Sequence, residues 1–116
     1  MPTLSILMAA RNEQFLARTL QDVFEHSEAD TEVIVVLDGP GFDGEPLPDD
    51  KRLRVVEFAE PIGQRAAVNH AAGLSQADYV MKLDAHCAVG QGFDRILMAD
   101  MQGHDDWTLV PKMFNL

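Results

Sequence analysis

The sequence predicts a single α/β domain in which a mostly parallel sheet carries helices on both faces. Short apolar runs alternate with amphipathic stretches along the chain, and no internal repeat or hinge divides its 116 residues. Strands that alternate with helical patterns favour parallel pairing, because each helix carries the chain back across the sheet. A chain of this length is sufficient for one hydrophobic core and therefore for one domain.

The first half of the chain predicts a strand, a helix and a second strand. Residues 3–9 (TLSILMA) form an apolar run, and residues 32–38 (EVIVVLD) predict a buried strand more strongly, because four of the seven are Val or Ile. Between them, Asn12 is expected to cap a helix before Glu13. The apolar stripe of that helix contains Phe15, Leu16, Leu20, Val23 and Phe24.

The second half continues the alternation after a surface loop. Residues 39–50 contain three Gly and three Pro among acidic residues, which indicates a loop. The elements expected after it are a strand over 52–58, a helix of small residues over 63–74, a strand over 78–84, a helix over 93–101 and a fifth strand over 107–113. Pro111 makes the last of these an edge strand or a bulge.

Composition and charge narrow the classes of function. Nineteen acidic and nine basic residues leave a formal charge of −10, so nucleic acid and anionic membranes are not expected as partners. The apolar segment at the start is too short to span a bilayer and lacks the features of a signal peptide. One cysteine, Cys87, excludes an internal disulfide, and we expect a cytoplasmic protein.

Polar side chains follow three of the predicted strands at the points where they end. The first strand leads into Arg11 and Glu13, the second ends in Asp38, and the fourth leads into Asp84 and His86. Ligands of open parallel sheets bind beyond the carboxyl ends of the strands, where neighbouring loops diverge. We therefore expect these side chains to meet at one edge of the sheet.

Asp84 and His86 are candidate metal ligands. Residues two apart in extended chain point to the same side, so the carboxylate and the imidazole can converge on one ion. One oxygen and one nitrogen ligand suit Mn²⁺ better than Mg²⁺ or Ca²⁺ and leave positions open for a diphosphate. An acidic protein needs such a cation to bind a polyanion.

Simpler explanations exist for each of these residues. Asp84 and His86 could form a hydrogen-bonded pair in a loop, and Asp38 could start a turn before Gly39. His70 could pack or cap instead of binding a ligand. These alternatives stay open at the level of the sequence, and the shared location of the polar residues is what favours a site.

Together, LSILMAARNE, EVIVVLDGP and GQRAAVNHAAGLSQADYVMKLDAHC resemble the nucleotide-binding half of GT-A-type glycosyltransferases, in particular family 2. The Asp-x-His motif followed by Cys is similar to that of the polypeptide N-acetylgalactosaminyltransferases. The resemblance covers about residues 3–112 and implies a fold of the nucleotide-diphospho-sugar transferase type. It implies that residues 1–116 are the nucleotide-sugar-binding, N-terminal half of the domain, without the acceptor-binding half.

The resemblance also implies roles for individual residues. Asp38 is expected to meet the nucleoside base, Ala9, Ala10 and Arg11 to form the pocket wall, and Asn69 to match the Asn of the helical motif. Asp84 would face the ribose and the metal, and His86 would coordinate the cation. The family often has Arg before that Asn, where this chain has Val68. Arg65, three residues earlier, is expected to replace that positive charge.

The function expected from the resemblance is transfer of a sugar, of the hexosyl or N-acetylhexosaminyl type, from a UDP-sugar to an acceptor hydroxyl with Mn²⁺ or Mg²⁺. No residue is assigned as the catalytic base. The alternative hypothesis is a non-catalytic nucleotide-binding or assembly module, which could form a homo-oligomer through its sheet face. A sugar nucleotidyltransferase ranks last, because AARNEQF lacks the glycines of a phosphate-binding loop.

Overall fold

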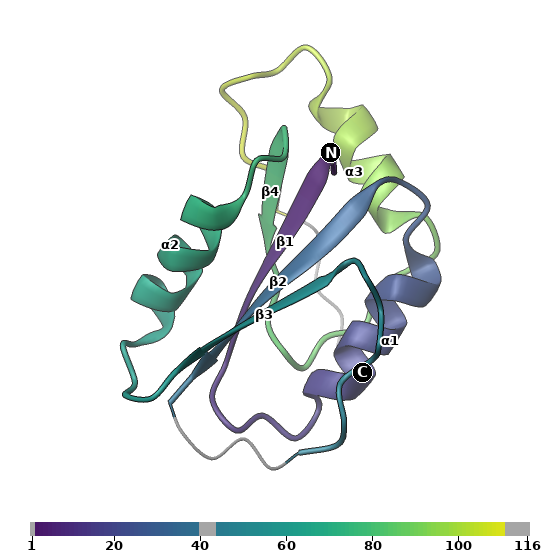
Figure 1. The fold of residues 1–116 in the computed structure, drawn as a ribbon. Coiled ribbons are helices and arrows are strands. Elements are labelled where there is room, and N and C mark those ends of the chain that lie inside the picture. Colours follow the sequence, from purple (N-terminus) through teal and green to yellow (C-terminus); the bar gives the residue numbers. More distant parts are fainter. Residues whose placement is uncertain (1, 40–43, 111–116) are drawn as a thin grey trace.

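The computed structural model describes residues 2–39 and 44–110 and contains a parallel four-stranded sheet. The strands are β1 (Leu4–Ala10), β2 (Thr31–Asp38), β3 (Leu53–Phe58) and β4 (Tyr79–Lys82), in the spatial order β3-β2-β1-β4 (Figure 1). All three strand pairs are parallel, which confirms the predicted sheet type. Because β1 and β2 occupy the centre, the carboxyl ends of β2, β1 and β4 lie side by side at one edge.

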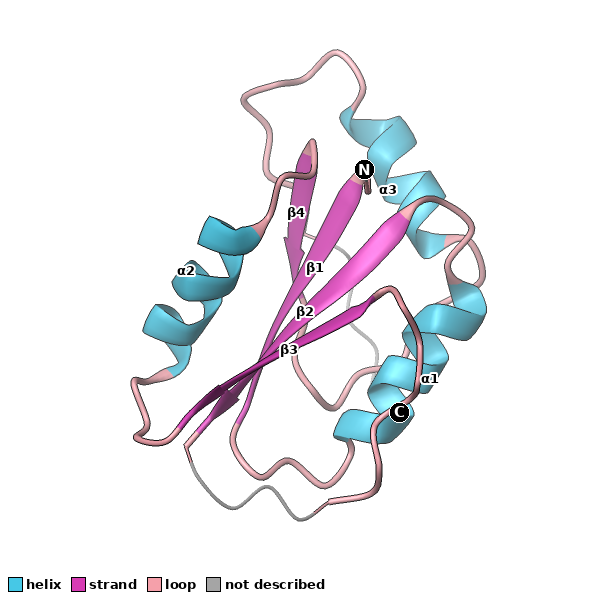
Figure 2. Cartoon of the chain, viewed as in Figure 1, coloured by secondary structure: helices cyan, strands magenta, loops and turns pink. Residues whose placement is uncertain are grey.

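Helices cover both faces of this sheet, as predicted. Helix α2 (Gln64–Leu74) lies on one face, and α1 (Leu16–His26) and α3 (Phe93–Met101) lie on the other (Figures 1 and 2). The small side chains Ala67 and Ala71 are fully buried on α2 and allow this helix to lie close to β1 and β2. The observed bounds agree with the predicted helices over 63–74 and 93–101 to within one residue.

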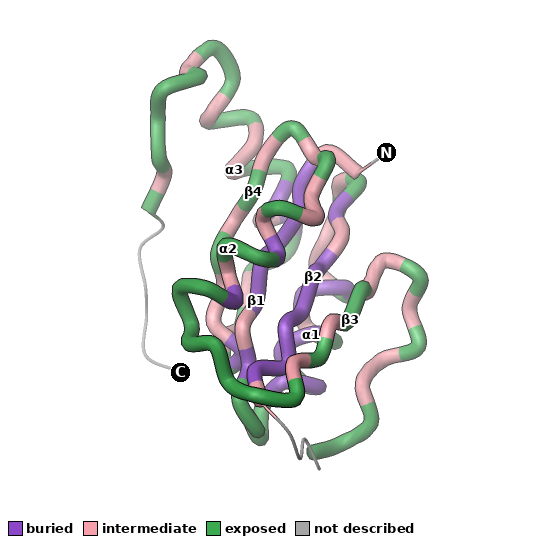
Figure 3. Tube along the Cα trace, turned by 60° about the vertical axis from the view of Figure 1, so that its left-hand side comes forward, coloured by how far each residue is buried: buried purple, intermediate pink, exposed green. Residues whose placement is uncertain are grey.

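Two apolar layers lie on the two faces of the sheet. Successive residues of a strand point to opposite faces, so Val33 and Val35 pack toward α1 while Ile34 and Val36 pack toward α2. Both central strands are almost entirely buried, whereas β3 and β4 alternate between half-buried and exposed residues (Figure 3). Burying each such aliphatic side chain contributes about 1.5–3 kcal/mol, so the central strands form the rigid base of the domain.

The start of α1 differs from the prediction. The helix begins at Leu16, and Asn12 does not cap it but adopts a left-handed conformation with φ of +49°. Asn tolerates this conformation better than most residues, and here it turns the chain between β1 and α1. Phe15 precedes the helix and is 43% exposed, so it is not part of the buried stripe that the sequence predicts.

The structure also corrects the end of the chain. Residues 107–110 do not form a strand, and residues 111–113 of the predicted strand lie outside the described part. Trp107 instead stacks on His104, with ring centroids 3.4 Å apart, and its backbone N–H donates to the carbonyl of His104. This local turn is incompatible with an extended chain. Of the predicted loop over 39–50, the described residues 44–50 contain no helix or strand, as expected.

Gly92 provides a test of the junction between α1 and α3. It has φ of +70°, and a Cβ atom there would lie 2.7 Å from Oε1 of Glu28. Glu28 is a flexible side chain that would move aside and disturb its bonds to Gln91 and Arg95. We therefore expect Gly92→Ala to lower the free energy of unfolding in urea by about 0.5 kcal/mol more than the roughly 1–2 kcal/mol that left-handed strain costs. Gly103→Ala is the matched control, because Gly103 has a similar φ of +79° with no atom within 4 Å. Equal losses for the two variants would contradict the expectation.

Candidate functional site

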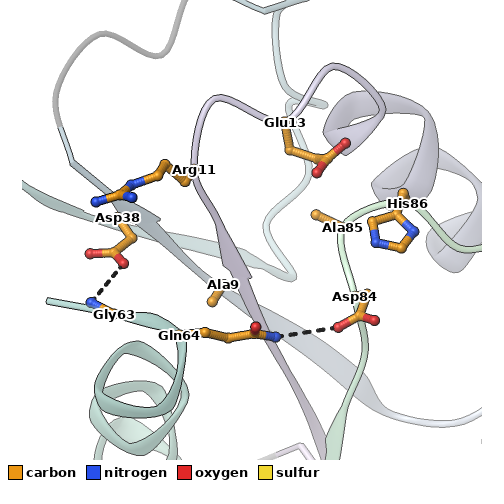
Figure 4. A pocket seen from close by; sticks show the side chains of 9 residues that line it. All are labelled: Ala9, Arg11, Glu13, Asp38, Gly63, Gln64, Asp84, Ala85 and His86. Carbon is orange, nitrogen blue, oxygen red and sulfur yellow. Dashed lines mark hydrogen bonds between the residues drawn. The ribbon is translucent and has the colours of Figure 1, made fainter. Parts of the chain in front are cut away.

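A cavity of about 330 Å³ lies at the carboxyl edge of the sheet, where the sequence predicts a site (Figure 4). Ala9 lies between the two walls of the cavity, with Asp38 and Gly63 on one side and Asp84 and His86 on the other. This arrangement follows from the strand order, because β1 runs between β2 and β4. The other residues that line the cavity are Arg11, Glu13, Gln64 and Ala85.

Asp38 forms one wall together with the chain that precedes α2. The residue is 6% exposed, and its carboxylate accepts hydrogen bonds from the N–H groups of Ile62 at 2.7 Å and Gly63 at 3.0 Å. Gly63 has φ of +92°, which a residue with a side chain rarely adopts. The side chain of Asp38 therefore fixes the entry into α2. The simpler explanation was that Asp38 starts a turn before Gly39. Such a turn does not account for the hydrogen bonds from Ile62 and Gly63.

Asp84 and His86 form the opposite wall and are both accessible to solvent. The side chain of Asp84 is 43% exposed, and its Oδ1 lies 3.5 Å from Nε2 of Gln64 and 3.7 Å from Nζ of Lys82. The imidazole of His86 is exposed and borders the same cavity. The two side chains share a cavity without hydrogen-bonding each other, so the simpler explanation of a loop pair does not hold.

The charges that line the cavity are mainly negative. Glu13, Asp38 and Asp84 contribute three carboxylates, and Arg11 contributes one guanidinium group. A diphosphate that enters this cavity meets a net negative field unless a cation accompanies it. The divalent ion that the sequence predicts stays a prediction.

The donor atoms available fit a partly open metal site. Within residues 2–39 and 44–110, no group of three or more His, Cys, Asp or Glu side chains is positioned to enclose an ion. Asp84 and His86 offer one oxygen and one nitrogen at the cavity wall, which suits Mn²⁺ with its other positions open to phosphate and water. The side chains that the structure describes therefore offer an open pair of ligands at most and not a closed structural site.

Cys87 follows His86 but does not suit the role of a metal ligand. Partial burial, and to a lesser extent the charge of Asp84, raise the pKa of the Cys87 thiol. Cys87 does not line the cavity that Asp84 and His86 share. Cys87 is therefore best described as a half-buried neighbour of the site.

Three residues predicted for the site do not line the cavity. Ala10 is buried in the core beneath it, and Arg65 and Asn69 are exposed on α2. Val68 packs partly buried against the sheet, so Arg65 does not share its environment although the two are three residues apart. The roles that the resemblance implies for these residues remain predictions. On the same helix, His70 packs edge-to-face on Phe58 with ring centroids 5.0 Å apart.

The structure adds residues to the site to which the sequence analysis assigned no role. Glu13, Gly63, Gln64 and Ala85 all line the cavity. Glu13 follows the exit of β1, where the sequence indicates polar residues but assigns this one no role. Gly63 and Gln64 mark the start of α2, and their position at the cavity depends on the hydrogen bonds of Asp38. A search for residues at the starts of helices would have found these two.

Comparison with protein families agrees with this geometry. The profile of the family described as Glycosyl transferase family 2 matches residues 5–112 of the chain. The chain belongs to this family. A comparison with curated proteins found no match.

Membership of glycosyltransferase family 2 gives the cavity a functional context. The parallel sheet with helices on both faces has the GT-A, nucleotide-sugar transferase type of fold, as the sequence predicts. This family 2 chain is a sugar-transfer module that works with a nucleotide-sugar donor and an acceptor. In the part of the chain that the structure describes, no helix has the length and apolar character needed to cross a membrane.

Proposed function

We propose that this family 2 glycosyltransferase binds a UDP-sugar at the carboxyl edge of its sheet and transfers a hexosyl or N-acetylhexosaminyl group to an acceptor hydroxyl with the help of Mn²⁺ or Mg²⁺. The observation that carries the proposal is the convergence of Asp38, Asp84 and His86 on one cavity. These residues lie up to 48 positions apart in the sequence, and only the sheet brings them together.

The nucleoside half of the donor is assigned to the wall formed by Asp38. Each oxygen of the Asp38 carboxylate accepts one backbone N–H and keeps further lone-pair capacity, which we assign to accepting from the base. The methyl side chain of Ala9 at the base of the cavity leaves room for a planar ring. Arg11 contributes a positive charge at the rim of the cavity.

The diphosphate half of the donor is assigned to the wall formed by Asp84 and His86. These two side chains would hold the divalent ion, and Asp84 would also face the ribose. When bound, the ion supplies positive charge that stabilises the departing nucleoside diphosphate. Nε2 of Gln64 lies 3.5 Å from Oδ1 of Asp84, so the start of α2 borders this wall of the cavity as well. The three carboxylates of the cavity explain why phosphate binding would depend on the ion.

Calorimetry with UDP, in the presence and absence of Mn²⁺, tests the proposal. We expect binding of UDP that depends on Mn²⁺, with CDP and ADP as controls for base selectivity. Metal-independent binding, or no binding by protein that circular dichroism shows to be folded, would count against the proposal. Release of free sugar from a UDP-sugar, measured in parallel, distinguishes transfer chemistry from a module that only binds.

Arg65 is assigned to the phosphates by its predicted role as a substitute for the family's Arg. The side chain of Arg65 is exposed, so water weakens any contact that it makes with phosphate and the expected loss is modest. We expect Arg65→Ala to weaken UDP–Mn²⁺ binding by about fivefold, or roughly 1 kcal/mol. Lys51→Ala removes an exposed positive charge from the turn before β3 and serves as the control. An Arg65→Ala variant that binds UDP as tightly as the parent would remove this residue from the site.

A further inference from the structure

The position of His86 is not secured by packing of its own side chain. The imidazole is exposed and borders two cavities, the one described above and a second of about 550 Å³ on the side of α1. A metal ligand that is exposed and borders open space on two sides depends largely on its backbone for placement. Ligands that are held in advance bind metal more tightly than ligands that must be ordered on binding.

Thr19 of α1 holds the backbone on both sides of His86. Its hydroxyl donates to the carbonyl of Ala85 at 3.0 Å and accepts from the N–H of Cys87 at 3.3 Å. Thr19 is 2% exposed, so both bonds lie in a region where unpaired polar groups are costly. A hydroxyl can donate and accept at once, and Ser and Thr are the smallest side chains that carry one.

Asp22 makes a second attachment one helical turn later. Its Oδ2 accepts from the backbone N–H of Val89 at 2.7 Å. Residues three apart in a helix share a face, so Thr19 and Asp22 present two attachment points to the same loop. Together they attach residues 85–89 to α1, a helix whose inner face is buried against the sheet.

We propose that Thr19 is a positioning residue that holds His86 in place for the metal, with Asp22 as its second support. This inference rests on the proposed function, because it assigns His86 to the cation. The hydroxyl of Thr19 acts through the two peptide groups that flank His86 and does not touch the ion or the donor.

The pair Thr19→Val and Thr19→Ser tests the proposal. Valine keeps the shape of threonine but removes the hydroxyl, whereas serine keeps the hydroxyl. We expect Thr19→Val to weaken Mn²⁺ affinity in the presence of UDP by about tenfold, in the range known for residues that orient metal ligands, and Thr19→Ser to stay within about twofold. In metal-free protein, the ring resonances of His86 should shift or broaden in Thr19→Val only.

The outcomes separate this inference from the proposed function. If the parent protein binds no Mn²⁺ with UDP, the proposed function fails, and the His86 resonances still decide whether Thr19 positions the ring. A folded Thr19→Val variant with the Mn²⁺ affinity and His86 spectrum of the parent overturns the inference.

Asp22 provides a second pair in case Thr19→Val does not fold. Asp22→Asn keeps an oxygen that can accept from Val89 and removes the charge, whereas Asp22→Ala removes both. We expect weaker Mn²⁺ binding and altered His86 resonances in Asp22→Ala, with Asp22→Asn close to the parent. Equal weakening in both variants would show that the charge of Asp22 matters and not its hydrogen bond, and would overturn its role as a support.

Discussion

Replacing Asp94 by alanine is expected to lower the free energy of unfolding by about 3 kcal/mol or more, a large part of the total for a domain of this size. Asp94 lies in the first turn of α3 and is completely buried. Its carboxylate accepts from the N–H groups of Glu28, Ala29 and Arg95 at 2.8–3.0 Å and from the hydroxyl of Thr31 at 2.7 Å. Alanine would leave these four donors without their acceptor.

The charge of Asp94 also predicts how the stability of the protein changes at acidic pH. Burial by itself raises the pKa of this carboxyl, but the four hydrogen bonds outweigh burial and hold the pKa below its ordinary value. Because the pKa of Asp94 is lower in the folded than in the unfolded protein, the ionised carboxylate stabilises the fold at pH values above the unfolded-state pKa of about 3.9. This stabilisation is lost as the pH falls from there through the lower pKa of the folded state. The difference in stability between the parent and Asp94→Asn should therefore shrink as the pH falls below about 4.

Urea unfolding at several pH values measures both effects. Asp100→Asn is the matched control, because Asp100 is exposed on the same helix. We expect this control to change stability by less than about 0.5 kcal/mol. A loss for Asp94→Ala no larger than that of the control would show that the hydrogen bonds around Asp94 do not hold α3 to the chain before β2.

Asp84→Asn is expected to reduce the affinity for UDP in the presence of Mn²⁺ by at least about 100-fold. Substitutions that only disturb the orientation of a metal ligand cost 10- to 100-fold, and this substitution removes the charge of a proposed ligand itself. Asparagine keeps the size of the side chain, and Asp84 is 43% exposed, so the fold should be little affected. Titration of the variant by calorimetry, with and without Mn²⁺, gives the loss directly.

Asp78→Asn is the control for Asp84→Asn. Asp78 is exposed and immediately precedes β4, at the opposite end of the strand from the cavity, so its replacement removes the same charge without touching the site. We expect parent-like binding from this control. If Asp84→Asn and Asp78→Asn bind equally well, the assignment of Asp84 to the cation is wrong, whatever the behaviour of His86.

Elements with a strong pattern were predictable from the sequence, and elements defined by distant contacts were not. The β-branched run of β2 and the small-residue pattern of α2 led to nearly correct bounds. The beginning of α1 was misplaced, because the conformation of Asn12 is set by the path from β1 to the helix and not by its preference for caps. In the sequence, Asp94 resembles any acidic residue in the first turn of a helix. Three of its four hydrogen-bond donors lie 63–66 positions earlier in the chain.

The sequence by itself determined the α/β class, the parallel sheet and the strand exits near Asp38 and Asp84, because periodicity is a local property of the chain. The predicted strand over 78–84 was too long: β4 ends at Lys82, and Ala85 and His86 lie in a turn, so the extended-chain argument for Asp84 and His86 does not hold. Only the tertiary structure decided which neighbours these residues have. The hydrogen bonds of Asp38 to the start of α2 and of Thr19 to the chain around His86 join segments 24 to 68 residues apart. No local pattern encodes such contacts, since they arise only when the packed sheet and helices bring the segments together.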